Sequence, residues 1–229
     1  HSFPTRRSSD LDQVRAALGA DLARTVVVVS SKSGGTLETD SQRRSFVQAF
    51  TATGIDPGQR VVVVTDPGSP LEELARTEGY RAVFLADPNV GGRYSALTAF
   101  GLVPSALAGA DVAALLAQAE PVLASLADDD APGLALGAVL GAAGRDKVAI
   151  DESGSDLVGF GDWAEQLIAE STGKQGTGLL PVVVEPGAPE VRWPASDVHV
   201  VRLAAPAPEL GTEVIGPLGT DDVLLQVAP

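Results

Sequence analysis

Four consecutive valines at residues 26–29 run directly into a polar turn, and no other stretch constrains the fold of this chain as much. An unbroken run of β-branched residues is typical of a strand that is buried on both faces, as in a parallel sheet. Residues 37–51 then have the composition of a helix. The candidate core residues of this helix are Leu37, Phe46, Val47 and Phe50. The sequence thus predicts a strand–turn–helix unit of an α/β protein.

The turn itself carries the groups that a phosphate-binding loop needs. The N-terminus of a helix presents unpaired N–H donors and a partial positive charge, so it attracts anions. Ser31, Ser33 and Thr36 would add hydroxyl donors. The glycine pair at 34–35 lets the backbone approach an anion closely. Helix caps without a ligand use the same residue types, so the turn alone leaves both interpretations open. Its spacing matches neither a Walker P-loop nor a dinucleotide-binding loop.

Strands alternate with helices along the rest of the chain, which favours right-handed βαβ units and parallel sheets. Further strands are expected at residues 61–65, 82–85, 147–151, 179–185, 198–203 and 223–227. Further helices are expected at residues 11–22, 71–78, 95–108, 111–127, 134–143 and 162–170, and a loop at 185–196. We place a domain boundary between residues 109 and 145. Ligands of such sheets lie beyond the carboxyl ends of the strands, which is where the serine turn falls.

Two further stretches hold candidate site residues. Arg93 follows a Gly-Gly turn after the strand expected at 82–85, where a solvated surface arginine is the simpler interpretation. In the helix expected at 162–170, with Asp162 as its N-cap, Gln166 and Glu170 are four residues apart and so share one face. Glu170 falls at the edge of an apolar stripe, where a half-buried carboxylate would suit a general base. A solvent-facing glutamate fits the same pattern.

Three motifs, in this order, carry a resemblance to a known family. They are Ser-Lys-Ser-Gly-Gly-Thr-Leu-Glu-Thr at residues 31–39, Gly-Gly-Arg-Tyr-Ser at 91–95 and Gln-Leu-Ile-Ala-Glu-Ser-Thr-Gly-Lys at 166–174. Together they resemble the glucose-6-phosphate isomerases, which are built from sugar isomerase (SIS) domains. The resemblance runs from about residue 11 to residue 185 and fades afterwards. The family's upstream loop and closing region have no counterpart here, so we interpret the chain as an interior fragment of such an enzyme.

The resemblance implies a fold and a reaction. The fold would be a parallel-sheet αβα sandwich, with an N-terminally truncated first SIS domain at residues 11–110. Linker helices and part of a second SIS domain would follow at residues 111–229. The intact enzyme would interconvert glucose 6-phosphate and fructose 6-phosphate through a cis-enediolate, in glycolysis and gluconeogenesis, without a metal or an organic cofactor. The family's sites lie at dimer interfaces, so a homodimer is expected for the intact enzyme. Little activity is expected for the fragment alone, because it lacks the family's upstream loop and closing region.

The resemblance also implies roles for individual residues. The substrate phosphate would bind Ser31, the Lys32 backbone, Ser33 and Thr36. Glu170 would be the catalytic base, with Gln166 as a supporting residue, and Arg93 would stabilise the enediolate anion, for which a permanently charged, planar guanidinium is suited. His199 does not lie in the motif that carries the family's ring-opening histidine. We therefore interpret His199 as a structural residue of its strand.

Composition excludes several classes of function. The formal net charge of −14 disfavours nucleic acid and anionic membranes as partners, because both require a basic face. The absence of cysteine excludes disulfides and thiolate metal sites. No apolar run reaches the roughly 18 residues of a transmembrane helix, and no signal peptide is recognisable, so a cytoplasmic protein is expected.

Residues 1–10 differ in composition from the rest of the chain. They are basic and serine-rich, ahead of an acidic, alanine-rich body. This decapeptide resembles the translation of a sequencing-adapter oligonucleotide, so we interpret it as non-native and exclude it from the fold. The alternative is a natural disordered N-terminus.

Other functions fit part of the pattern. One alternative is a non-catalytic SIS-type module that binds a sugar phosphate. Others are a different phosphosugar isomerase, an isomerase fused to a second enzyme, and a doubly wound domain without a small-molecule ligand. A binding module would keep the serine turn, but it has no need of Arg93, Gln166 and Glu170 together. The joint presence of these three residues favours an enzyme.

Overall fold

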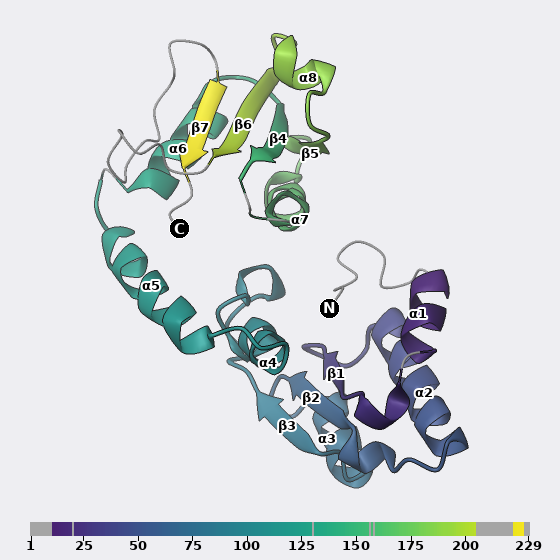
Figure 1. Ribbon diagram of the computed structural model, residues 1–229. Coiled ribbons are helices and arrows are strands. Elements are labelled where there is room, and N and C mark those ends of the chain that lie inside the picture. Colours follow the sequence, from purple (N-terminus) through teal and green to yellow (C-terminus); the bar gives the residue numbers. More distant parts are fainter. Residues whose placement is uncertain are drawn as a thin grey trace. The chain divides into compact units, whose positions relative to one another are not determined.

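Two sheets organise the chain, and all pairings between their strands are parallel (Figure 1). The structure, a computed structural model, describes residues 11–19, 21–129, 131–155, 157, 159–204 and 222–226, so the decapeptide at 1–10 lies outside the described residues. The prediction of an α/β protein with parallel sheets is confirmed. The chain divides into a first unit, His1–Gln118, and a second unit, Ala119–Pro229, which are described separately.

The first unit contains a three-stranded sheet in the order β1-β2-β3. Its strands are β1 (Val27–Ser30), β2 (Val61–Thr65) and β3 (Ala82–Leu85). Its helices are α1 (Leu11–Leu18), α2 (Leu37–Ala52), α3 (Pro70–Thr77) and α4 (Ala99–Leu107), and α5 (Val112–Ser125) begins in it. Short 3-10 turns are η1 (Leu22–Arg24), η2 (Pro57–Gln59) and η3 (Gly92–Tyr94).

The central strand β2 is the core of the first unit, because all five of its residues are buried between two neighbouring strands. The apolar cluster on one face of the sheet comprises Val29, Val61, Val63, Leu71, Ala75 and Tyr80. Helix α3 supplies two of these residues, and Val47 of α2 packs against the cluster. Helix α4 lies against β2 and β3 on the other side (Figure 1). The first unit is thus a sheet between two layers of helices.

Helix α2 follows the turn as predicted, but one of its expected core residues is wrong. Phe50 is fully buried, and Val47 packs against the core. Leu37, by contrast, is 77% exposed. It is the first residue of α2 and directly follows the loop, where the helix has not yet reached the sheet.

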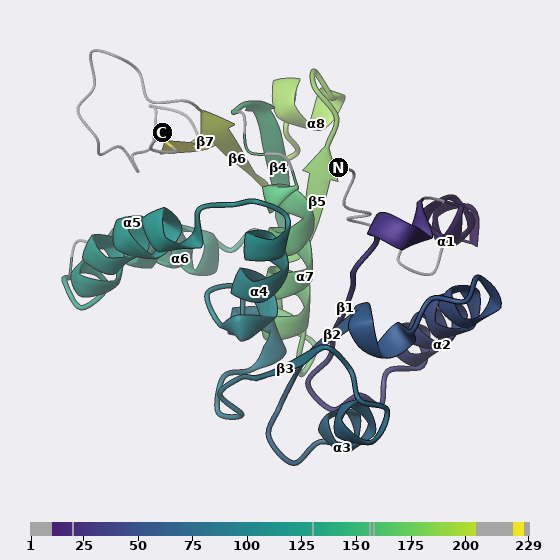
Figure 2. The ribbon, with the colours of Figure 1, turned by 60° about the horizontal axis from the view of Figure 1, so that its bottom comes forward.

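The second unit contains a four-stranded sheet in the order β5-β4-β6-β7 (Figure 2). Its strands are β4 (Lys147–Gly154), β5 (Leu180–Val184), β6 (Val198–Ala204) and β7 (Asp222–Gln226). Its helices are α6 (Pro132–Ala142), α7 (Phe160–Thr172) and α8 (Pro189–Arg192). The short helix α8 lies in the stretch that was expected to be loop.

The core of the second unit lies between its sheet and helices α6 and α7. Its buried members are Leu140, Val148, Ile150, Ala164 and Val201. His199 is also buried, at 2% exposure, inside β6. Helix α7 begins earlier than predicted, because Gly159, and not Asp162, is its N-cap. Gly159 adopts a left-handed conformation with φ of 86°, which glycine tolerates best.

The buried β2 face gives a test of the fold. Val63→Ala removes two fully buried methyl groups and leaves a cavity, so it should destabilise the first unit by about 2–3 kcal/mol. Val26→Ala is the matched control, because Val26 is 43% exposed and its loss should cost less than about 0.5 kcal/mol. Hydrogen exchange of the β2 amides measures the loss of stability in both variants. A local measurement is needed because the two units need not unfold together. Equal protection in the two variants would contradict the assignment of β2 as the core.

Candidate functional site

The loop between β1 and α2 is held in shape by its own serines. The Ser31 hydroxyl accepts a hydrogen bond from the Gly34 N–H at 3.1 Å, and the Ser33 hydroxyl accepts one from the Gly35 N–H at 3.1 Å. Gly34 has a φ of +72°, and a Cβ there would lie 2.5 Å from the Leu71 Cβ of α3. A side chain at this position would clash with Leu71, so only glycine allows the loop to pack this closely against α3.

The N-terminus of α2, directly after this loop, is exposed. Thr36 is the N-cap, and within the described part of the chain its side chain makes no capping hydrogen bond. Ser33 and Thr36 are both exposed. Their hydroxyls can therefore reach a ligand at the N-terminus of α2, where the helix dipole favours an anion.

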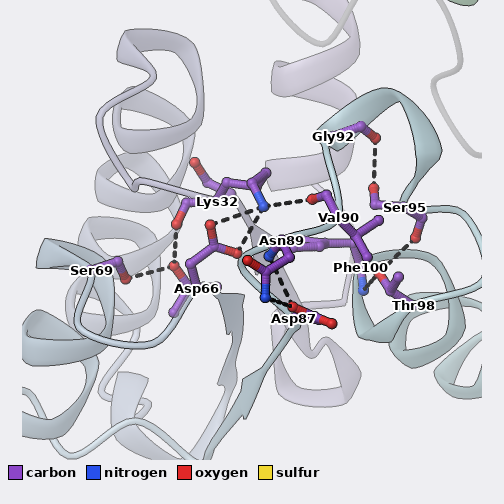
Figure 3. A network of polar contacts seen from close by, with 12 residues as sticks. Lys32, Asp66, Ser69, Asp87, Asn89, Val90, Gly92, Ser95, Thr98 and Phe100 are labelled. Carbon is purple, nitrogen blue, oxygen red and sulfur yellow. Dashed lines mark hydrogen bonds and ion pairs between the residues drawn. The ribbon is translucent and has the colours of Figure 1, made fainter.

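Lys32 joins the loop to its neighbours (Figure 3). Its carbonyl accepts hydrogen bonds from the Asp66 N–H at 3.1 Å and the Thr65 hydroxyl at 3.0 Å, both at the end of β2. Its ammonium lies 3.0 Å from a carboxylate oxygen of Asp66 and donates to the Val90 carbonyl at 2.8 Å. Lys32 was expected to contribute its backbone, and its side chain is a second connection that the sequence did not reveal.

Arg93 lies in η3, three residues beyond Val90, and is half-buried. The turn is closed by a hydrogen bond of 2.7 Å from the Ser95 hydroxyl to the Gly92 carbonyl, shown in Figure 3. Because Lys32 contacts Val90, the structure brings the serine loop and the Arg93 turn together at the carboxyl ends of β1, β2 and β3. These two predicted parts of the site belong to one unit.

Gln166 and Glu170 lie in the second unit, on the C-terminal half of α7. The Gln166 amide donates to the Glu170 carboxylate at 3.0 Å, which confirms that they share one face. Both side chains are exposed, so of the two interpretations of Glu170 the solvent-facing one is correct and the half-buried one is wrong. The covered side of α7 runs through Ala164 and Ile168, and Glu170 points about 200° away from Ile168 around the helix.

Helix α7 is fixed to its sheet at its N-terminal end. The Glu152 carboxylate of β4 accepts a hydrogen bond from the Gly161 N–H, an arrangement that the helix dipole favours. The Glu165 carboxylate accepts one from the Val183 N–H of β5 at 3.4 Å. A Cβ at Gly161 would lie only 3.0 Å from Val183, so glycine permits the close approach. These contacts set the orientation of the face that carries Gln166 and Glu170.

A metal centre and a membrane-spanning helix are two further possibilities for the described residues. Among the described residues, no group of three or more His, Cys, Asp or Glu side chains is arranged to hold a metal ion. No helix in the same part of the chain is both long and apolar enough to cross a membrane.

Comparison with known proteins gives the family context. No protein-family model matches the chain. The chain is 40% identical over 195 residues to the glucose-6-phosphate isomerase of Synechococcus elongatus. The aligned region makes up 82% of this chain and 37% of that relative. It is 38% identical over 178 residues to a probable glucose-6-phosphate isomerase of Haloarcula marismortui, with coverages of 75% and 41%. This chain is homologous to part of a glucose-6-phosphate isomerase.

Solved structures agree with this relationship. A glucose-6-phosphate isomerase from Chlamydia trachomatis superposes with a TM-score of 0.68 at 27% identity, covering 85% of this chain and 42% of that one. A hypothetical protein from Thermus thermophilus superposes with a TM-score of 0.74 at 30% identity, with coverages of 92% and 55%. The chain spans only about two fifths of the length of the curated glucose-6-phosphate isomerases named above. This agrees with the expectation that it carries part of such an isomerase.

Sequence reasoning missed two residues that the structure connects to the glucose-6-phosphate isomerase motifs. Glu152 holds the N-terminus of the helix that carries Glu170, and Asp66 holds the Lys32 ammonium. Glu152 gave no local signal, because it lies nine residues before Gly161 in sequence. Asp66 gave no such signal, because it is 34 residues from Lys32 in sequence.

The close contact of Gly34 with α3 can be tested with two glycine substitutions. Gly34→Ala and Gly68→Ala place alanine at nearly the same φ, +72° and +73°, but a Cβ at Gly68 would meet no atom within 4 Å. Gly68→Ala should therefore cost about 1–2 kcal/mol for its left-handed backbone alone. Gly34→Ala should cost clearly more, because its Cβ must displace Leu71. Amide exchange in β1 and β2 measures the difference, and equal costs would rule out the packed loop.

Proposed function

We propose that this chain carries the phosphate loop and the proton-transfer residues of a glucose-6-phosphate isomerase. The intact enzyme would interconvert glucose 6-phosphate and fructose 6-phosphate, a step of glycolysis and gluconeogenesis in the cytoplasm. The observation that carries the proposal is the sequence identity to enzymes of this name across four fifths of the chain. This sequence identity favours an enzyme over a binding module. No metal or organic cofactor enters the proposal.

The serine loop is proposed to bind the substrate phosphate. Ser31, Ser33 and Thr36 would donate hydroxyl hydrogens, and the backbone of Lys32 and of the following glycines would donate N–H groups. The exposure of Ser33 and Thr36 and the free N-cap hydroxyl in the described structure support this role. Because the net charge is −14, the phosphate must be held by these local donors against the overall field.

Glu170 is proposed as the base that moves a proton between C2 and C1. It would remove the C2 proton of the open-chain aldose to give a cis-enediolate, and then return a proton to C1 to give the ketose. Such a transfer needs one carboxylate within reach of both carbons. The hydrogen bond from Gln166 orients the Glu170 carboxylate, which supports the role.

Arg93 is proposed to stabilise the enediolate. The intermediate carries negative charge on oxygen, and a fixed guanidinium next to it lowers its energy without further reorganisation. The half-buried position of Arg93 on a closed turn suits a group that must be held in place.

We further propose that residues 11–110 belong to one SIS domain and residues 111–229 to linker helices and part of a second, and that the intact enzyme is a homodimer.

The phosphate loop is tested by Thr36→Val in the full-length enzyme that contains this chain. Loss of one hydrogen bond to a charged group should weaken substrate binding by about 1.5–3 kcal/mol. The effect should fall mainly on KM, because the phosphate is remote from the reacting carbons. Thr77→Val is the matched control, since the exposed Thr77 hydroxyl donates to the Glu73 carbonyl of its own helix. An unchanged KM in Thr36→Val would remove this loop from the site.

The proton transfer is tested by Glu170→Gln in the same enzyme. This variant keeps the size of the side chain but removes the base, so kcat should fall by roughly 10²–10⁴-fold. Binding of an acyclic sugar-phosphate inhibitor should change much less, because its phosphate contacts are elsewhere. The decisive measurement is exchange of the C2 hydrogen with deuterated water. Glu190→Gln, an exposed glutamate of α8, is the control. A Glu170→Gln enzyme that exchanges at the parent rate would show that another group is the base.

A further inference from the structure

The Lys32 side chain occupies the centre of a polar network at the carboxyl edge of the first sheet (Figure 3). Its ammonium contacts both oxygens of the Asp66 carboxylate, at 3.0 and 3.2 Å, and donates to the Val90 carbonyl at 2.8 Å. It also lies 5.7 Å from the centre of the Phe100 ring, within the range of a cation–π contact. The ammonium thus contacts the end of β2, the loop after β3 and helix α4.

This geometry distinguishes Lys32 from a phosphate ligand. An ammonium has three hydrogens, and here they are directed to a carboxylate, a carbonyl and a ring face. The ion pair is also shielded, with the Lys32 and Asp66 side chains only 31% and 19% exposed. To reach a bound phosphate, the ammonium would have to leave all three partners.

The Asp66 end of the network is rigid. Asp66 directly follows the fully buried strand β2, and its own N–H donates to the Lys32 carbonyl at 3.1 Å. Next to it, the buried Thr65 hydroxyl lies 2.7 Å from the Ser69 hydroxyl and donates to the same Lys32 carbonyl. Lys32 is therefore attached to the strand end by both its backbone and its side chain.

The other end of the network is the Arg93 turn. Val90 is held by Lys32 and is three residues from Arg93. The aliphatic stem of Lys32 also runs beside Gly92, since a Cβ on that glycine would meet the Lys32 Cδ at 3.8 Å. The lysine therefore holds the turn through its hydrogen bond to Val90, and its stem lies close to Gly92.

We infer that Lys32 is a positioning residue for Arg93: its ammonium fixes the turn of residues 90–93 to the end of β2. This inference rests on the proposed function, in which Arg93 stabilises the enediolate. Lys32 then contributes to the chemical step through the placement of Arg93, while the phosphate is held by the hydroxyl and N–H donors of the loop.

The test is Lys32→Met in the full-length enzyme, which removes the ammonium and keeps a stem of similar length. We expect kcat to fall by about 10–100-fold, the cost of displacing a catalytic group by about 1 Å. KM and inhibition by inorganic phosphate should change by less than about twofold, a change within the error of additivity. Hydrogen exchange in residues 88–95 should become faster. Lys147→Met is the matched control, because the Lys147 ammonium also bonds two carboxylates, Asp146 and Asp197, but at the amino end of β4.

A double variant separates positioning from independent action. If Lys32 acts through Arg93, Lys32→Met should lower kcat by less than about twofold in an Arg93→Ala enzyme. If the two losses multiply, or if Lys32→Met weakens phosphate inhibition and leaves kcat unchanged, the inference is wrong. Asp66→Asn, which keeps the shape of the side chain and weakens the ion pair, provides the same comparison should Lys32→Met fail to fold. For Asp66→Asn we expect a lower kcat and an unchanged KM. An unchanged kcat in this variant would overturn the inference.

Failure of this inference differs from failure of the proposed function. If Arg93→Ala lowers kcat but Lys32→Met and Asp66→Asn do not, Arg93 keeps its role and only the positioning by Lys32 is lost. If Arg93→Ala and Glu170→Gln both leave the isomerisation rate unchanged, the proposed function itself is wrong.

Discussion

Burial of β2 between two parallel partners is the constraint on which the first unit depends. All five of its residues are buried, so the strand is stabilised mainly by apolar contacts with β1, β3 and the covering helices. Because parallel strands run in one direction, their carboxyl ends meet at a single edge. That edge receives the serine loop, Asp66 and the loop that leads to Arg93. The polar site is therefore a direct consequence of how the apolar strand is buried.

Each predicted site element is attached to its sheet by residues that would not themselves contact a substrate. Asp66 holds Lys32 in the first unit, and Glu152 holds the N-terminus of α7 in the second. In both cases a carboxylate at the end of a strand fixes a segment that carries a candidate site residue. Such contacts lie in places where the backbone would otherwise be free to shift, and they reduce the number of conformations available to the loops.

Local pattern predicted most of the fold. The valine run, the βαβ alternation and the i,i+4 spacing of Gln166 and Glu170 were sufficient to predict β1, β2, α2 and the shared face of these two residues on α7. Sequence reasoning failed where the answer depended on the rotation of a helix about its axis, or on contacts between residues far apart in sequence. The sequence left the burial of Glu170 undecided, because the rotation of α7 about its axis depends on tertiary contacts such as the close approach of Gly161 to β5. The contact between Lys32 and Val90 joins residues 58 apart, which no local pattern reveals.

The hydroxyls of Ser31 and Ser33 have a consequence for how tightly the loop can hold an anion. In the described structure they already accept hydrogen bonds from the N–H groups of Gly34 and Gly35. An arriving anion would replace these internal acceptors, so the number of hydrogen bonds made by the two glycines would not increase. For these two N–H groups the gain in free energy would come from charge, because an oxygen of a phosphate dianion accepts a hydrogen bond more strongly than a neutral hydroxyl does. The loop would thus discriminate by the charge of its ligand, and neutral sugars would gain little from it.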